Sequence, residues 1–155
     1  MEWWHHALHY GFERRSQTHD SGTLAIAWGD GSGTGTKGTF ELISSSTGSA
    51  TNLEMWMGTW NTHVHSQSSN WRELRTLLGA LERERHHVPS RVAGRRFFYF
   101  TDNQVTYDLI RRTSSRSPGL QTLLLDIKGL ELELDCALEV IHVPGRAMIR
   151  QGTDG

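Results

Sequence analysis

The chain has 155 residues, of which 36% are hydrophobic and 21% are charged, and its formal net charge is −1. This length corresponds to about one domain of ordinary size, and this composition disfavours a disordered chain. With a charge so close to zero, the molecule as a whole has no positive field to draw it to nucleic acid, so any such binding depends on local patches.

Cysteine usage and hydropathy narrow the protein class further. The only cysteine is Cys136, which excludes an intrachain disulfide and a cysteine-based zinc module. This usage fits a reducing compartment, and we expect an intracellular protein of the cytoplasm or nucleus. Apolar runs such as Phe97–Phe100 are far shorter than the roughly 18 residues that a membrane span needs, so no membrane partner is expected.

The N-terminal half predicts an arm followed by three strands. The first 20 residues are rich in histidine and tryptophan without a clear period, which indicates an N-terminal arm. Leu24–Trp28 is short and wholly apolar, as is typical of a strand buried on both faces. Gly31–Gly38 is glycine-rich and predicts a long turn, whereas Thr39–Ile43 and Leu53–Trp60 are β-prone runs. A three-strand meander is the natural interpretation.

A helix and a basic loop are predicted next. Asn70 and Glu73 have the spacing of an N-cap and its capping-box partner, and apolar residues then recur at helical spacing to about His86. The stretch Val88–Arg96 contains proline and glycine and therefore predicts a loop. Three arginines make this loop basic: Arg91, Arg95 and Arg96.

The C-terminal part alternates strands and helices. Phe97–Thr101 predicts a buried strand, and a short helix follows Asn103. Because a helix precedes this strand, it is expected to run parallel to an earlier strand through a right-handed crossover. Ser117 and Pro118 are an N-cap and a first helical residue, and they open a third helix with a leucine stripe. Leu138–Val143 is predicted as the last strand, so the fold class is α/β.

Four acidic residues stand at informative places in this order of elements. Asp30 follows the first strand, Glu73 lies in the first turn of the first helix, Asp102 follows the fourth strand, and Asp154 lies beyond the fifth. Sites in open α/β sheets form beyond the carboxyl ends of parallel strands. If the first and fourth strands are neighbours, about 4.8 Å apart, Asp30 and Asp102 are able to share a cation.

Each acid also has a purely structural alternative. Asp30 between glycines is a good turn residue, and Glu73 closes a capping box if Asn70 is the N-cap. Asp102 is an ordinary N-cap candidate for the next helix, as is its neighbour Asn103. Asp154 at the chain end is otherwise expected to fray.

Taken together, four motifs in order resemble a known family, the ribonuclease H domains attached to reverse transcriptases of retroelements. The resemblance covers about residues 23–155. The motifs are Asp30–Gly33, Ser69–Leu74, Phe100–Asn103, and His142–Gly145 leading to Gly152–Gly155.

The resemblance implies a fold and a reaction. The fold is a five-stranded mixed sheet flanked by helices, with three antiparallel strands followed by two parallel ones, over residues 21–155. The reaction is hydrolysis of the RNA strand of an RNA/DNA hybrid, with Mg²⁺ as cofactor and Mn²⁺ able to substitute. The catalytic and metal-binding acids are carried over by motif to Asp30, Glu73, Asp102 and Asp154.

The resemblance also implies where the hybrid is held. Family positions that grip the hybrid correspond to Gly31, Ser32, Asn70, Arg72 and Asn103. Basic segments are expected to supply counterion release, one at Arg91, Arg95 and Arg96 and another at Arg111, Arg112 and Arg116.

Two features of the chain depart from the family pattern. His142 is an auxiliary candidate for product release, but its place inside the last strand favours a packed histidine. The family continues into a final helix after its last acid, whereas this chain stops one residue after Asp154, so impaired activity is expected.

Three functions remain open on this evidence. The first is a retrotransposon-type ribonuclease H, with a reverse transcriptase of the same polyprotein as partner. The second is a catalytically weakened module of the same fold that binds hybrid or supports a polymerase. The third is an integrase-like or exonuclease relative on the same scaffold.

Overall fold

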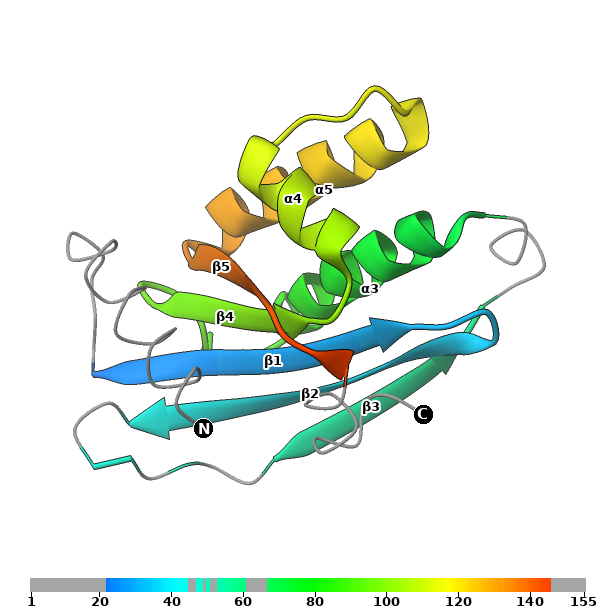
Figure 1. The fold of residues 1–155 in the computed structure, drawn as a ribbon. Helices are drawn as coiled ribbons and strands as arrows, with labels where there is room; N and C mark the ends of the chain where they lie inside the picture. Colours follow the sequence, from blue (N-terminus) through cyan, green and yellow to red (C-terminus); the bar gives the residue numbers. More distant parts are fainter. Residues whose placement is uncertain (1–21, 45–46, 49, 51–52, 61–66, 146–155) are drawn as a thin grey trace.

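The structure is a computed structural model that describes residues 22–44, 47, 48, 50, 53–60 and 67–145. The predicted N-terminal arm and Asp154 lie outside these residues. The elements, labelled as in Figure 1, are β1 (Thr23–Gly31), β2 (Gly35–Ser44), β3 (Glu54–Thr59), α3 (Ser69–Glu84), β4 (Arg96–Thr101), α4 (Gln104–Arg112), α5 (Pro118–Leu134) and β5 (Ala137–His142).

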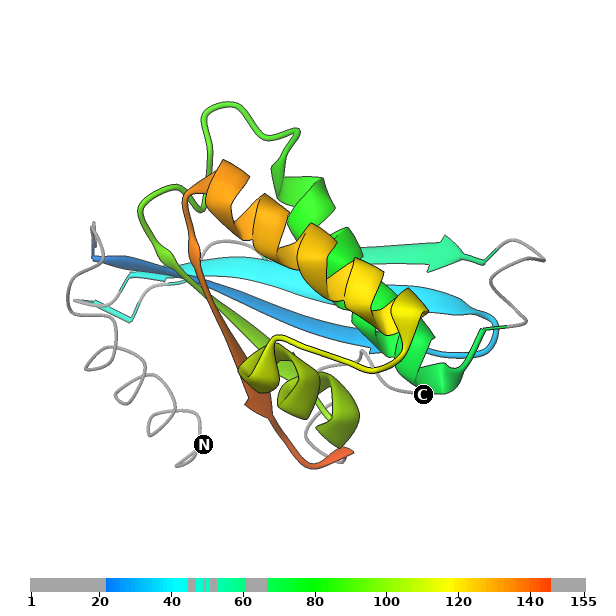
Figure 2. The same ribbon diagram turned by 90° about the horizontal axis from the view of Figure 1, so that it is seen from above.

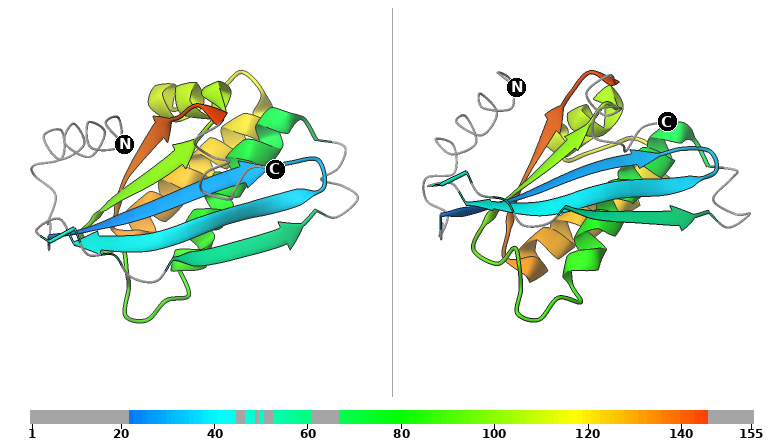
Figure 3. Two further views of the ribbon diagram at one scale, coloured as in Figure 1. Left: turned by 60° about the horizontal axis from the view of Figure 1, so that its bottom comes forward. Right: turned by 90° about the horizontal axis from the view of Figure 1, so that it is seen from below.

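The sheet has the predicted mixed topology. Its five strands lie in the order β3-β2-β1-β4-β5, with β3 and β5 at the edges (Figure 3). The β1/β2 and β2/β3 pairs are antiparallel, and the β1/β4 and β4/β5 pairs are parallel. The predicted fold class is therefore confirmed, and the strand expected to run parallel to an earlier one, β4, pairs with β1.

The helices cover one face of the sheet, with α3 and α5 packed side by side (Figures 1 and 2). Side chains alternate along β1, so Ala25 and Ala27 face the helices while Ile26 and Trp28 face the opposite side. On that opposite side, the rings of Trp28 and Phe100 lie 4.5 Å apart. The apolar run of β1 is thus buried on both faces, as its sequence predicts.

The turn after β1 is much shorter than predicted. The strand runs on to Gly31, and β2 already begins at Gly35. The turn between them is closed by the Ser32 N–H, which donates to the Gly35 carbonyl at 2.8 Å. Gly35 and Gly38 belong to β2, and the ring of Trp56 packs where a side chain at Gly38 would lie.

The N-cap of α3 also differs from the prediction. Ser68, and not Asn70, caps the helix, because its side chain accepts a hydrogen bond from the Trp71 N–H at 3.1 Å. The capping box between Asn70 and Glu73 is therefore wrong. The predicted Ser117 cap of α5 is confirmed, and of the two candidates for the cap of α4, Asp102 and Asn103, the structure has Asn103.

The basic loop before β4 is largely occupied by internal contacts. The Arg91 guanidinium forms ion pairs with the buried carboxylate of Glu84 and with Glu54, and it lies 4.0 Å above the ring of Phe40. Arg96 is only 2% exposed. The predicted nucleic-acid contact is therefore wrong for Arg91 and Arg96, because one is already neutralised by two carboxylates and the other is buried.

None of the helices in the described part of the chain is long and apolar enough to cross a membrane.

Candidate metal centre

Strand register brings two of the predicted acids to one edge of the sheet. The parallel pairing of β1 and β4 reaches Trp28 opposite Phe100. Asp30 lies two residues beyond Trp28 in the last part of β1, and Asp102 directly follows the last residue of β4. Because parallel strands end on the same side of a sheet, both acids come to the carboxyl ends of this strand pair.

The third acid comes from α3, which passes directly against the end of β1. A methyl group on Gly31 would meet Thr76 Oγ1 at 2.6 Å and the Arg72 carbonyl oxygen at 2.7 Å, so only glycine allows this approach. The Gly31 N–H donates to Glu73 Oε1 at 3.2 Å. This bond turns Glu73 toward the sheet edge and away from the helix N-terminus.

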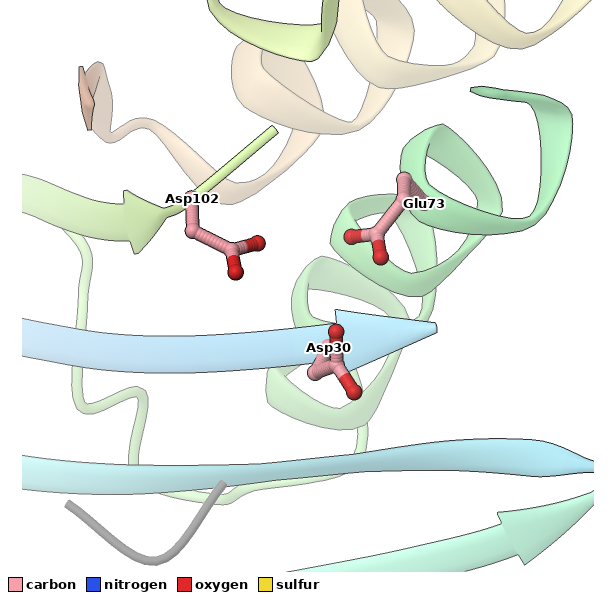
Figure 4. A group of neighbouring side chains, drawn as sticks. All are labelled: Asp30, Glu73 and Asp102. Atoms are coloured by element: carbon pink, nitrogen blue, oxygen red, sulfur yellow. The ribbon is translucent and has the colours of Figure 1, made fainter. Parts of the chain in front are cut away.

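The three carboxyl groups converge (Figure 4). One oxygen from each of Asp30, Glu73 and Asp102 lies within 4.8 Å of the other two. Glu73 is buried, and the two aspartates are partly buried. The predicted fourth acid, Asp154, lies outside the described residues.

Burial and like charge make this site unfavourable for three ionised carboxylates. The pKa of Glu73 is raised from 4.5 to about 9. Burial is the largest cause, followed by the charge and hydrogen bond of Asp30 and, more weakly, by the charge of Asp102, while the Gly31 N–H acts in the opposite direction. Glu73 Oε2 is buried and has no hydrogen-bond donor among the described residues. Either a proton or a bound cation is needed to neutralise the negative charge of this buried carboxylate.

The donor set fits a hard divalent cation. All the converging ligand atoms are carboxylate oxygens, which are the ligands that Mg²⁺ and Mn²⁺ favour over nitrogen or sulfur. A cation at this place would offset the repulsion among the three acids and satisfy Glu73 Oε2. The arrangement is therefore chemically suited to hold a metal ion.

Some of the residues predicted to bind the hybrid already form hydrogen bonds within the protein. The Ser32 carbonyl accepts from Trp60 Nε1 at 2.7 Å, and Arg72 Nη1 donates to the Gln67 carbonyl at 2.6 Å. Asn103 Oδ1 accepts from the Thr106 N–H at 2.6 Å and so caps α4.

His142 is not a packed histidine, and that expectation is wrong. It is the last residue of β5 and is exposed. Its Nε2 lies 3.2 Å from the carbonyl oxygen of Asp102, and its ring centroid is 6.3 Å from that of Tyr107. Because β5 ends at His142, no further residue of the strand covers this side chain. His142 is thus beside the acidic cluster.

The sequence analysis did not single out Tyr99, whose hydroxyl lies against Gly29, the residue before Asp30. Tyr99 belongs to β4, is 1% exposed, and faces the helices. A side chain on Gly29 would overlap the Tyr99 hydroxyl. The available signal was one hydroxyl in an otherwise phenylalanine-rich strand, three residues before Asp102.

No protein-family model matches this chain, and the search of curated proteins finds no match. Solved structures do match. A ribonuclease H1 from the halophilic archaeon Halobacterium salinarum aligns with a TM-score of 0.58 and 17% identity, covering 82% of this chain and 90% of that one.

Two further structures contain an RNA/DNA hybrid. The ribonuclease H1 LC11, isolated from compost by a metagenomic approach, aligns with a TM-score of 0.60 and 14% identity, covering 81% of this chain and 89% of that one. A foamy viral protease-reverse transcriptase aligns with a TM-score of 0.53 and 10% identity, covering 85% of this chain but only 18% of that one. These similarities show that the chain has the ribonuclease H fold.

Proposed function

We propose that this protein is a metal-dependent ribonuclease that hydrolyses the RNA strand of RNA/DNA hybrids. One observation carries the proposal: Asp30, Glu73 and Asp102 converge at the carboxyl ends of a parallel strand pair in a ribonuclease H fold. The fold alone is compatible with many functions. The acidic cluster, suited to a hard cation, is the feature that favours phosphodiester hydrolysis.

The acids have distinct roles in this proposal. When bound, paired Mg²⁺ ions activate a water molecule and stabilise the departing 3′ oxygen of the cleaved phosphodiester. In this proposal Asp30 and Asp102 would hold both ions, and Glu73 would hold one. Asp154 is the proposed fourth ligand. Mn²⁺ is expected to substitute for Mg²⁺ because it accepts the same oxygen ligands.

The hybrid is proposed to lie across the edge that carries these acids. Selection of RNA over DNA requires contact with the 2′-hydroxyl group. We assign that contact to the backbone of Gly31 and Ser32 and to Asn70, with Arg72 and Asn103 near the phosphates. The chain exposes a basic group at the end of α4 that is able to release counterions from the hybrid: Arg111, Arg112 and Arg116.

His142 and a polymerase partner complete the proposal. His142 is exposed beside Asp102, where a mobile imidazole is able to assist product release. The likeness to one part of a foamy viral protease-reverse transcriptase supports a reverse transcriptase of the same polyprotein as partner. We therefore propose a retrotransposon-type domain.

A strand-specific cleavage assay tests this function. The full chain is incubated with Mg²⁺ or Mn²⁺ and a hybrid labelled on either strand. We expect cuts in the RNA strand alone, with the rate reduced at least about 100-fold in Asp102→Asn, because a proposed metal ligand is lost. Asp126→Asn, an exposed change on α5, is the matched control and should cleave normally.

The same assay separates the alternatives. Hybrid binding without cleavage by a folded protein would support the binding module that serves a polymerase. Cuts in the DNA strand, or trimming from the ends, would support an integrase-like or exonuclease relative. A chain extended beyond Gly155 is tested in parallel, and inactivity of both lengths contradicts the proposed function.

A further inference from the structure

The hydroxyl group of Tyr99 is buried next to Gly29, near the acidic cluster, and has no hydrogen-bond partner among the described residues. Tyr99 is 1% exposed, and its hydroxyl makes no hydrogen bond with any described residue. An unpaired buried hydroxyl destabilises the folded state, and phenylalanine would fill the same space without this cost. A phenol at this position therefore needs an explanation other than packing.

The backbone leaves room for this hydroxyl at the metal-binding edge. A methyl group on Gly29 would overlap the Tyr99 hydroxyl and would lie 2.7 Å from the ring carbon that bears it. Gly29 immediately precedes Asp30, so the Tyr99 hydroxyl lies next to the last residues of β1, on the face of the sheet that the helices cover. The absence of a side chain at one position thus permits the hydroxyl at the other.

The charges of the three acids act on the Tyr99 phenol. The pKa of Tyr99 is raised well above its ordinary value, mainly by burial and then by the charges of Glu73, Asp30 and Asp102 in that order. Ionisation of the phenol is therefore disfavoured, and the group remains a neutral O–H donor. Among the acids, Glu73 acts on it most strongly.

A second unpartnered atom belongs to Glu73, whose carboxylate contacts Gly31, two residues along β1 from the glycine that the Tyr99 hydroxyl lies against. Glu73 Oε1 already accepts from the Gly31 N–H, but Glu73 Oε2 is buried and lacks a donor. The site therefore contains a buried donor and a buried acceptor, both unpaired. Donors to the carboxylates that ligate metal ions orient those ligands and strengthen metal binding.

We propose that Tyr99 is a positioning residue of the metal centre, whose hydroxyl donates to the Glu73 carboxylate when a divalent cation is bound. The inference rests on the proposed function, because it requires that the acids hold a cation. The hydrogen bond to a charged carboxylate in a dry environment is stronger than one between neutral groups. It fixes the direction of the Glu73 side chain toward the cation.

A purely structural role predicts different behaviour, and the chain offers a matched control. Thr39 Oγ1 is also buried and without a partner among the described residues. Thr39 pairs with Trp28 in the register of β1 and β2, so it lies on the opposite face of the sheet from Tyr99. Thr39→Val and Tyr99→Phe each remove one unpartnered buried hydroxyl, but only the Tyr99 hydroxyl lies on the same face of the sheet as α3, which carries Glu73.

Calorimetric titration of the full-length protein with MgCl₂ alone, and with MnCl₂ alone, tests the proposal. We expect Tyr99→Phe to weaken cation binding about threefold to tenfold, which corresponds to the loss of one hydrogen bond. Thr39→Val should bind as the wild type does. Without metal, Tyr99→Phe should melt at the same temperature as the wild type or higher, because an unpaired buried hydroxyl is removed.

Tyrosine labelled with ¹³C at the ζ carbon supplies a spectroscopic signature. The chain has three tyrosines, and the Tyr99 signal is identified by its loss in Tyr99→Phe. Mg²⁺ should shift this signal in the wild type and leave it unchanged in Asp102→Asn. If Tyr99→Phe binds Mg²⁺ as tightly as the wild type, the positioning role is overturned and the proposed function stands. If the wild type binds neither cation, both are overturned.

Discussion

The Gly31 N–H donates to Glu73 Oε1 at 3.2 Å, across 42 positions of sequence. This bond links the end of β1 to α3 and holds the third acid beside Asp30. It also decides between two roles for Glu73, since a carboxylate engaged here is not closing the N-terminus of its own helix. The same contact requires glycine at position 31, because α3 leaves no space for a side chain.

The raised pKa of Glu73 predicts a pH-dependent stability in the absence of metal. The folded state holds the Glu73 proton up to a pH of about 9, whereas the unfolded chain releases it near 4.5. The stabilisation is therefore complete below pH 4.5 and is lost as the pH rises toward 9, with a slope of at most about 1.4 kcal/mol per pH unit. Urea unfolding in EDTA across this range should show the decline.

The control for this measurement is Glu73→Gln, which cannot titrate. The difference in unfolding free energy between the variant and the wild type should grow in favour of the variant as the pH rises. Parallel pH profiles for the two proteins would contradict the burial-driven shift.

Divalent cations are expected to stabilise the folded protein. A cation that binds only the folded state contributes about 2.7 kcal/mol at a concentration 100 times its dissociation constant. The melting temperature should therefore rise with Mg²⁺ concentration. Asp30→Asn should melt higher than the wild type without metal, because one repelling charge is removed. It should then respond little to Mg²⁺, and a full response in this variant would count against the site.

Gly29 is expected to be intolerant of a side chain because of Tyr99. Gly29→Ala places a methyl group against the Tyr99 hydroxyl and ring, and overpacking of this kind costs about 1–3 kcal/mol. Removing the hydroxyl should recover part of the loss, so Gly29→Ala with Tyr99→Phe should be more stable than Gly29→Ala alone. Additive effects in this double-mutant cycle would show that the two residues do not interact.

The ion pairs of Arg91 should matter far more than those on the surface. Glu84→Ala removes the buried 2.7 Å partner of the Arg91 guanidinium and leaves only Glu54, so we expect a loss of about 1.5–3 kcal/mol of unfolding free energy. Glu133→Ala removes the exposed pair with Arg85 and should barely move the urea midpoint. Equal effects of the two changes would contradict the internal role of Arg91.

The N-cap of α3 can be tested with neighbouring residues. Ser68→Ala should lower the unfolding free energy by about 1 kcal/mol, because the Trp71 N–H loses its acceptor. Asn70→Ala should leave stability nearly unchanged but weaken hybrid binding, if its amide contacts the minor groove. Thermal unfolding and a hybrid-binding titration measure the two effects. A larger stability loss in Asn70→Ala would restore Asn70 as the cap.

The misplaced cap shows where local patterns become ambiguous. Ser68, Ser69 and Asn70 are consecutive, and each is a favourable N-cap residue. Short-range chemistry cannot choose among them. The structure has Ser68 as the cap, and Glu73 contacts Gly31 of the sheet instead of closing a capping box.

The basic loop shows a similar limit. Arginines in a loop indicate a charged surface, and nothing nearby in sequence reveals that Glu54 is a partner of Arg91. Tyr99 was missed for the same reason, because its hydroxyl matters only through Gly29, 70 positions earlier.

Local patterns in the sequence predicted the order of strands and helices, the Ser117 cap of α5, and an acid directly after the fourth strand, whereas Asp30, predicted to follow the first strand, lies inside β1. These features depend on residues a few positions apart, where periodicity and capping chemistry act. The packing of distant segments was needed to show that Asp30, Glu73 and Asp102 share one site, that Arg91 and Arg96 turn inward, and that the Tyr99 hydroxyl lies against Gly29. The physical reason is that charge, burial and hydrogen bonding at those groups are set by segments far apart in the chain, which meet only when the sheet and α3 pack together.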